Sequence, residues 1–227
     1  MRPFKTVTLA PAAASATAVC AAQTPAAGAL TINGGSASGG VATLDIARRV
    51  LVTTAGAESG KTLTLTGTDR AGIPIIEAVA LPSAGTVATA QDFATVTGAS
   101  ISAAAAGSIS VGTNATASSA WIKLDTISGH FGATAELDFS SGSGTVSIEG
   151  TLDETDIAAV EYAPGGSGNL SAGGLSSRTF RPPTPIAIQA GATTTQLVSF
   201  TTPVRAVRLT ITAGSGPVKM TVLQQGI

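Results

Sequence analysis

The chain has 227 residues, enough for one large domain or two ordinary ones; only 11% of them are charged, and the formal net charge is −1. The 12 lysine and arginine residues are spread along the sequence. They do not form the clustered positive surface that direct nucleic-acid binding needs. No stretch reaches the roughly 18 uninterrupted apolar residues of a membrane span. The single cysteine, Cys20, cannot form an intrachain disulfide.

The first 22 residues allow two interpretations. A basic start followed by an Ala-rich stretch that reaches Ala22 resembles a secretory signal. However, the apolar part contains Pro11 and Thr17 and almost no Leu, Ile or Phe. The segment Thr6–Leu9 also alternates polar and apolar residues as a strand does. We therefore favour a first β-strand here.

The segments that follow combine β-branched and apolar residues in alternation, separated by turns rich in Gly, Ser, Asn and Pro. In the first half this pattern predicts strands over residues 4–10, 29–33, 41–46, 48–54, 61–67, 75–81, 93–97, 100–103 and 108–112. In the second half it predicts strands over residues 131–139, 145–151, 186–189, 196–200, 205–212 and 219–224. A helical period appears only at Asp153–Tyr162, which could form one or two turns. So many short strands, at intervals of about 8–12 residues, predict an all-β protein of sandwich or barrel-like domains.

The stretch Ala55–Thr62, "AGAESGKT", resembles a phosphate-binding P-loop with Ala in place of the first Gly. A P-loop needs a strand before it and a helix after it, because the helix N-terminus faces the phosphates. Residues 49–54 supply the strand. Strict alternation over Thr62–Gly67 predicts a second strand where the helix should be. We therefore interpret the stretch as a hairpin turn that binds no nucleotide.

A second copy of this unit closes the chain. Residues 205–226 repeat the order Arg, alternating strand, Thr-Ala-Gly, short turn, Lys and alternating strand, without the GK[ST] signature. Residues 101–112 and 139–150 show a weaker strand–turn–strand echo. Two copies favour two domains, which we place at 1–118 and 119–227. The Gly/Ser-rich residues 163–178 and the Pro-rich residues after them predict a long flexible loop over 163–185.

No group of residues has the pattern of a catalytic or metal site. The single histidine, His130, has no nucleophile motif near it in sequence. The acidic run Asp153–Asp156 lacks the spacing of a calcium loop. Asp69 and Glu77 flank a turn and could pair as catalytic carboxylates, but nothing else predicts a sugar site around them. We expect a protein without catalytic activity, cofactor or bound metal.

Four arginines occupy matched places in the two repeated units: Arg48, Arg49, Arg205 and Arg208. One interpretation is that they are exposed or edge-strand charges that prevent wrong pairing. The other is that they form ion pairs across a subunit interface. The single tryptophan, Trp121, stands where the two predicted domains meet, and we interpret it as a core residue of that junction.

Several phrases occur together along the chain: "KTVTLAP", "ARRVLVTTAG", "LTLTGTDRAGIPIIEAV", "DFATVT", "SISVGTNATASSAWIKLD", "PVRAVRLTITAG" and "MTVLQQG". In this combination the sequence resembles a group of tailed-bacteriophage structural proteins of about this length, encoded among head and tail genes. The resemblance covers most of the chain except the loop at 163–185. It implies a virion component and no catalytic residue.

The low charge agrees with that implication, because a soluble monomer usually carries about 25% charged residues. A surface with so few charges is typical of a chain that other subunits cover. We therefore expect a structural protein of the virion that forms homo-oligomers and contacts major capsid, neck or tail subunits. A capsid decoration or cement role comes first, and a neck, collar or tail role second. The alternative is a receptor- or carbohydrate-binding module of a tail fibre, with Trp121 as its candidate sugar platform.

Overall fold

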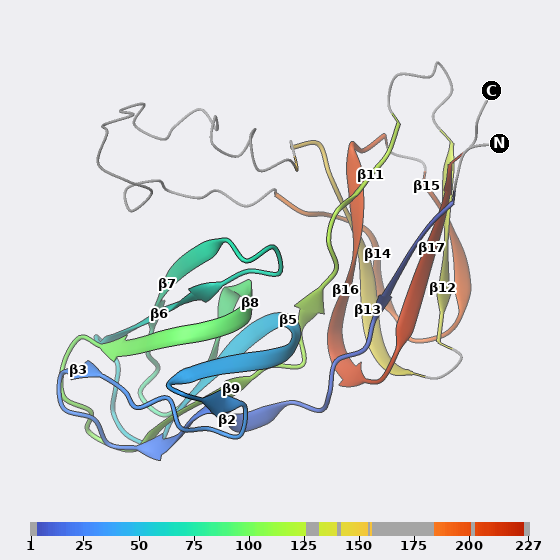
Figure 1. The fold of residues 1–227 in the computed structure, drawn as a ribbon. Coiled ribbons are helices and arrows are strands. Elements are labelled where there is room, and N and C mark those ends of the chain that lie inside the picture. The colour runs from blue at the N-terminus through green and yellow to red at the C-terminus, as the bar shows by residue number, and fades with distance from the viewer. Residues whose placement is uncertain are drawn as a thin grey trace, which may run out of the picture.

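A computed structural model describes residues 4–125, 132–139, 142–153, 155, 184–200 and 203–224. These residues form strands β1 to β17 and contain no helix, so the all-β prediction is confirmed. No helix in this part of the chain is long and apolar enough to span a membrane. The strands belong to three antiparallel sheets, which we call A, B and C, and each sheet is open at its edges (Figure 1).

Sheets A and C form a β-sandwich. Sheet A has four strands in the order β1 (Lys5–Leu9), β17 (Val218–Gln224), β12 (Ala133–Asp138) and β15 (Gln196–Phe200). Sheet C has the order β10 (Ala117–Ser118), β16 (Ala206–Ser215), β13 (Ser143–Thr151) and β14 (Ile186–Ala192), and β11 (Ile122–Lys123) also pairs with β16. One hydrophobic cluster takes side chains from both sheets, among them Leu137 and Met220 of sheet A and Ile148 and Leu209 of sheet C. Alternate residues of each strand therefore face a shared core between the two layers.

Sheet B is a single larger sheet with a core of its own. Its main path is β2 (Ser15–Gln23), β9 (Ile109–Thr113), β5 (Val41–Thr54), β8 (Gly85–Ile101), β6 (Thr62–Thr68) and β7 (Pro74–Ala80); β3 (Gly28–Ala29) and β4 (Ala37–Ser38) pair with β8 and β5. The β5–β8 ladder shifts register twice, and such bulges bend a strand and increase its twist. The sheet curves around one cluster that includes Cys20, Val52, Leu65, Phe93 and Val111.

The predicted hairpins are wrong in their pairing, although the strands themselves exist. Residues 55–61 join β5 to β6, but β8 lies between these two strands and pairs with both. Residues 216–217 join β16 to β17, which belong to opposite layers of the sandwich. The segments predicted as successive strands at 131–139 and 145–151 correspond to β12 and β13, which again lie in different sheets. The repeated unit is a connection between strands that are not neighbours.

Several strand boundaries also differ from the predictions. The predicted strand 93–97 and residues 100–101 of the predicted strand 100–103 belong to the single long strand β8, which ends at Ile101. The predicted strands 41–46 and 48–54 are parts of β5. The Ala-rich connection near the start contains the unpredicted strand β2. The first strand, favoured over a signal segment, is present as β1.

Two segments from the N-terminal side of the predicted domain boundary at residues 118 and 119 pair with strands from its C-terminal side. Strand β1 pairs with β17 near the other end of the chain, and β10 pairs with β16. Both segments were assigned to the N-terminal domain, yet both complete the sandwich of the C-terminal one (Figure 1). A short alternating strand can complete any sheet with an open edge, so its own sequence does not state its partner. The division into 1–118 and 119–227 as separately folding domains stays a prediction.

The long Gly/Ser-rich loop at 163–185 lies outside the described residues, apart from Thr184 and Pro185. His130 and most of the helical turns predicted over 153–162 also lie outside them.

Candidate functional site: a charged junction between the sheets

The segment that resembles a P-loop has its lysine engaged within the chain. Lys61 Nζ donates hydrogen bonds to Glu58 Oε2 and to the Ala104 carbonyl oxygen, each at 2.7 Å. The Glu58 side chain is fully buried, and its Oε1 accepts from the backbone N–H groups of Ala106 and Gly107, at 2.8 Å each. Strand β6 follows directly, as predicted, in place of a helix. The loop 55–61 is thus tied to the loop before β9 by its own carboxylate.

Arg48 is a core residue and not a surface charge. Only 1% of it is exposed. Its Nε donates to the Asn114 carbonyl oxygen at 2.8 Å, and its Nη1 donates to the Ala12 carbonyl oxygen at 3.0 Å and to both oxygens of Asp45 at 3.1 Å. Ion pairing of Arg48 across a subunit interface stays a prediction, but its interpretation as an exposed or edge-strand charge is wrong, because the side chain is buried. It holds three segments of its own chain together.

The Asp45 carboxylate shows how the chain stabilises this buried cation. Burial alone would raise the pKa of Asp45. The hydrogen bond from the Ala12 N–H, at 2.6 Å, and the pairing with Arg48 outweigh burial and hold the pKa below its usual value of 3.8. The Asp45 carboxyl is accordingly ionised at neutral pH.

Arg208 lies on sheet C beside the segment that enters the sandwich from sheet B. Its Nε donates to Glu149 Oε2 at 2.7 Å, and its guanidinium carbon lies 4.6 Å from the centroid of the Trp121 ring. Thr210 Oγ1 donates to the same Glu149 oxygen at 3.0 Å and to Ser118 Oγ at 3.3 Å. Trp121 is half-buried and belongs to neither hydrophobic cluster, so the prediction of a core residue is wrong; one face of its ring lies against a cation.

Residues of sheet B complete this network from the other side. Asp92, on β8, accepts a hydrogen bond from the Ser118 N–H at 3.0 Å, and Arg70 Nη2 lies 3.8 Å from the same Asp92 oxygen. Arg70, in the turn before β7, donates to the Ser118 carbonyl oxygen. Ser118 therefore bonds to sheet B through its backbone and to Thr210 of sheet C through its side chain. We call Arg70, Asp92, Ser118, Trp121, Glu149, Arg208 and Thr210 the junction cluster.

Burial dominates the electrostatics of the Arg70–Asp92 pair. It raises the pKa of Asp92 above 3.8 despite the opposing effects of Arg70, of Ser118 and of Arg208. It also lowers the pKa of Arg70, although Asp92 acts in the opposite direction. Both pKa shifts favour the uncharged forms. The free energy lost by removing the two charges from water is therefore larger than the free energy gained from their attraction. Such a pair fixes the geometry of a contact more than it adds stability.

The two other predicted arginines lie in different surroundings. Arg49 is the register partner of Asp92 in the β5–β8 ladder, and its Nε and the Asp92 Oδ1 are buried without a hydrogen-bond partner within the described residues. Arg205 is exposed, and its backbone joins Thr151 to Leu124. Ion pairing of Arg49, Arg205 or Arg208 across a subunit interface stays a prediction.

The carboxylates considered in the sequence as catalytic or calcium-binding groups accept hydrogen bonds from backbone N–H groups at separate places in the fold. Asp69 Oδ1 accepts from the N–H groups of Ala71 and Ile73, at 2.8 and 2.9 Å, and so closes a turn. Glu77 accepts from two backbone N–H groups of β8. Asp153 accepts from the Thr184 N–H at 2.7 Å. In the part of the chain that the structure describes, no three His, Cys, Asp or Glu side chains gather as a metal site would require.

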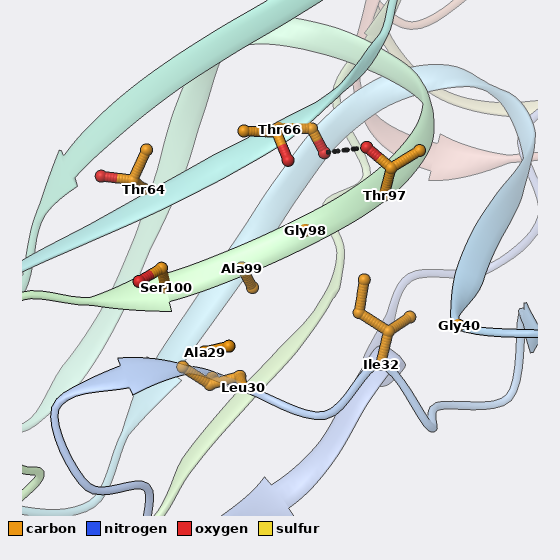
Figure 2. A pocket seen from close by; sticks show the side chains of 10 residues that line it. All are labelled: Ala29, Leu30, Ile32, Gly40, Thr64, Thr66, Thr97, Gly98, Ala99 and Ser100. Carbon is orange, nitrogen blue, oxygen red and sulfur yellow. Dashed lines mark hydrogen bonds between the residues drawn. The ribbon is translucent and has the colours of Figure 1, made fainter.

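A surface hollow of about 390 Å³ forms an open groove on sheet B (Figure 2). Its lining comes from β6, from the end of β8 and from the segment after β3: Ala29, Leu30, Ile32, Gly40, Thr64, Thr66, Thr97, Gly98, Ala99 and Ser100. These residues offer hydroxyl groups and small apolar surfaces, without an ionisable or aromatic side chain among them. The groove therefore lacks the groups that acid–base chemistry or sugar stacking uses.

Comparison with models of known protein families and with curated proteins finds no match to this chain.

Sequence reasoning found three of the residues that surround the junction, Trp121, Arg208 and Arg49, but missed Arg70 and Asp92. These two stand in a turn and in the middle of a strand, and no motif marks them. One signal for Arg48 was available. It shares the even-numbered face of β5 with Val50 and Val52, both fully buried, and strict alternation places all three on the same side.

Proposed function

We propose that this chain is a non-enzymatic structural component of a tailed-bacteriophage particle, present in many copies. Its role is that of a capsid decoration or cement protein, or of a neck, collar or tail protein. The observation that supports this best is the distribution of charge and apolar surface. Only 11% of the residues are charged, whereas large apolar side chains remain exposed in the described part of the chain.

Part of this small set of charges is neutralised by pairing within the chain. Arg48 pairs with Asp45, Lys61 with Glu58, Arg208 with Glu149, Lys219 with Asp138, and Arg70 with Asp92. Six large hydrophobic residues are exposed instead: Phe4, Ile76, Leu152, Ile186, Leu197 and Leu223. Exposed apolar side chains on open sheets favour contacts with other subunits. Cohesion of this kind needs no specialised residues and suits a particle built from repeated copies.

The junction cluster supports a mechanical role. It connects sheet B to the sandwich by a continuous series of hydrogen bonds that passes through Ser118. A protein that bridges neighbouring subunits must keep its two parts at a fixed angle under load. The alternative, a carbohydrate-binding module that uses Trp121, is less favoured, because Arg208 already covers one face of the ring.

The test is to count this protein in purified particles of a phage that encodes it. Quantitative mass spectrometry should find tens to hundreds of copies for each particle, as expected for a repeated surface component. Particles assembled without the protein should form poorly or lose DNA on heating or osmotic shock. Absence from the particle would contradict the proposal. Particles without it that assemble and resist heat normally, but fail to adsorb to the host, would favour the receptor-binding alternative.

A further inference from the structure

Sheet A is the one sheet of the three in which every described strand pairing is regular. The pairings β1–β17, β12–β17 and β12–β15 run without a register shift. Sheets B and C both contain shifts, in β2–β9, β5–β8 and β6–β8 and in β13–β14 and β13–β16. Bulges twist an edge away from new partners, so a sheet without them keeps flat edges that can accept another strand.

The two edges of sheet A, β1 and β15, carry little protection against such pairing. Strand β15 has the sequence QLVSF, without proline and without charge, and β1 has a single charge at its first residue, Lys5. By contrast, the edge strand β7 of sheet B begins with Pro74 and carries Glu77. Proline and charge are the usual means by which proteins block an edge. Within the described residues, β1 pairs only with β17 and β15 only with β12.

The strand directions at these two edges are complementary. Each neighbouring pair in the order β1–β17–β12–β15 is antiparallel, so β15 runs opposite to β1. A second copy placed beside the first in the same orientation therefore brings its β1 antiparallel to β15 of the first copy (Figure 1). The added strand pair has the same sense as every other pair in the sheet. Such a contact is head-to-tail and uses a different edge from each copy.

The side chains on the outer face agree with this arrangement. Leu197, Glu136, Thr221 and Thr6 are successive register partners, so they share one row and one face. Leu197 is 73% exposed and stands at one edge of that row. Phe4 is 68% exposed and precedes Thr6 by two residues, so alternation places it on the same face at the opposite edge. These are the two most exposed large hydrophobic residues of the described chain.

We propose that copies of this chain join head to tail through sheet A, with β15 of one copy added to β1 of the next. In this arrangement Leu197 of one copy lies directly opposite Thr6 of the other copy and diagonally opposite Phe4. Both distances allow side-chain contact between paired strands. Backbone hydrogen bonds supply the cohesion, and the two exposed apolar side chains cover each other. This inference deepens the proposed function and rests on it for the presence of many copies.

An edge contact explains Glu136 better than a face contact does. Glu136 is exposed in the middle of the same row and makes no hydrogen bond or ion pair within the described residues. A partner that covered the whole outer face would bury this carboxylate without a counter-charge, at high cost. A partner at the edge leaves it in water. Since β15 has only five residues, one seam is weak and gains strength from closure into a ring or from attachment to a particle.

Cysteine cross-linking of the purified full chain tests the seam directly. The variants Leu197→Cys and Phe4→Cys each place one thiol on an exposed side chain. Native Cys20 is fully buried, and burial raises its pKa to about 11, so it does not react. A short bis-maleimide is added to each variant alone and to an equal mixture. Head-to-tail contact places the two different positions together and keeps identical positions a subunit apart, so the mixture should give at least about ten-fold more covalent dimer than either variant alone.

The matched control is Ile76→Cys, which is 64% exposed on the edge strand β7 of sheet B. Its mixture with Leu197→Cys should give no more dimer than the single variants. A mixture of Leu197→Cys and Phe4→Cys that yields no extra dimer overturns the proposal. Efficient dimer formation by Leu197→Cys alone also overturns it, because that result means a symmetric contact.

A charge exchange gives a second readout without cross-linking. Leu197→Lys and Phe4→Glu should each abolish concentration-dependent association in sedimentation velocity. Their mixture should restore it, because Lys meets Glu at one seam and the native pair meets at the next. Loss of association in both variants with no rescue in the mixture overturns the head-to-tail pairing. These experiments use the purified protein and need no particle. If the copies do not associate through sheet A but virions contain many copies, the head-to-tail contact is rejected and the proposed function stands. If the copies associate but virions contain none of the protein, the proposed function alone is rejected.

Discussion

The Arg208 guanidinium stacks over the Trp121 indole at 4.6 Å from the ring centroid while its Nε donates to Glu149 at 2.7 Å. One side chain thus holds the segment that enters the sandwich against the face of sheet C. A guanidinium makes both contacts at once because it is planar. Its flat face stacks on the indole, while its N–H groups point outward in the guanidinium plane and can donate to a carboxylate. An ammonium group offers a point charge and cannot reproduce this pair of contacts.

Arg208→Lys should therefore behave as a loss and not as a conservative change. We expect unfolding free energy to fall by roughly 1–2 kcal/mol, which corresponds to one charge-assisted hydrogen bond and a cation–π contact. Trp121 is the only tryptophan, so its fluorescence during urea unfolding reports on the junction itself. The control is Lys5→Arg, which exchanges the same two residue types at an exposed position of β1 and should change stability by less than about 0.5 kcal/mol. Equal effects of the two substitutions would contradict this account of the junction.

Substitution of Arg48 should reduce the stability of the protein far more than substitution of its neighbour Arg49. Replacing Arg48 with Met removes hydrogen bonds to the carbonyl oxygens of Ala12 and Asn114 and leaves Asp45 without its cation. We expect a loss of roughly 2–4 kcal/mol, since partly buried acceptors lose a buried charged donor. Denaturant unfolding measures it. Arg49→Met, at the next residue, is the matched variant and should cost less than half as much, and a larger cost there would contradict the assignment of Arg48 as the core residue.

Much of the strand content was visible in the sequence because local alternation is a direct consequence of one buried face. The alternation in Thr62–Thr68 buries Leu63 and Leu65 completely and leaves the threonines between them half-exposed. The same rule places Val198 and Phe200 inward and Leu197 outward on β15. In these strands each residue's environment depends on its own strand, so the pattern alone is sufficient.

Strand partners were not visible, because pairing depends on which edges remain open after the rest of the chain has folded. The turn at 55–61 has the residues of a hairpin, yet β8 enters between the strands it joins. The partner of β1 is β17, more than 200 residues away in the sequence. The junction cluster likewise unites residues from five separate segments, and nothing near Arg70 or Asp92 in the sequence records the other members.

The repeated Thr-Ala-Gly signal has a physical reason that the structure supplies. At Gly56 a Cβ atom would stand 2.6 Å from the Gly107 backbone nitrogen, and at Gly107 a Cβ would stand equally close to Gly56. The two loops touch through bare backbone. Gly56→Ala should therefore force them apart and destabilise the protein by about 1–3 kcal/mol.

Gly35→Ala is the matched control for this substitution. A Cβ at Gly35 would meet nothing within 4 Å, and its φ lies outside the left-handed region. Removing a glycine there reduces the entropy of the unfolded chain and should leave stability unchanged or raise it by less than about 1 kcal/mol. Thermal and urea unfolding of both variants provide the measurement. A Gly56→Ala protein as stable as Gly35→Ala would mean that the two loops do not touch.

Glu58 and Asp92 should change the stability of the protein with pH in opposite directions. The Lys61 hydrogen bond, followed by the N–H groups of Gly107 and Ala106, outweighs burial and holds the pKa of Glu58 below its usual 4.5. The folded protein therefore binds this proton less readily than the unfolded chain does. The ionised carboxylate contributes stability above about pH 4.5, and that stability is lost as pH falls through the lower folded value.

Asp92 behaves in the reverse way. Burial raises its pKa above 3.8, against the effects of Arg70, Ser118 and Arg208, so the folded protein retains the proton more readily than the unfolded chain. Its contribution is fully present below pH 3.8 and is lost as pH rises through the folded value. Relative to the native chain, Glu58→Gln should lose stability progressively as pH rises from about 3 to 7, and Asp92→Asn should gain over the same range. Urea unfolding at each pH measures both differences. If they change with pH in the same direction, burial does not dominate at the junction, and Asp92 is a conventional stabilising partner of Arg70.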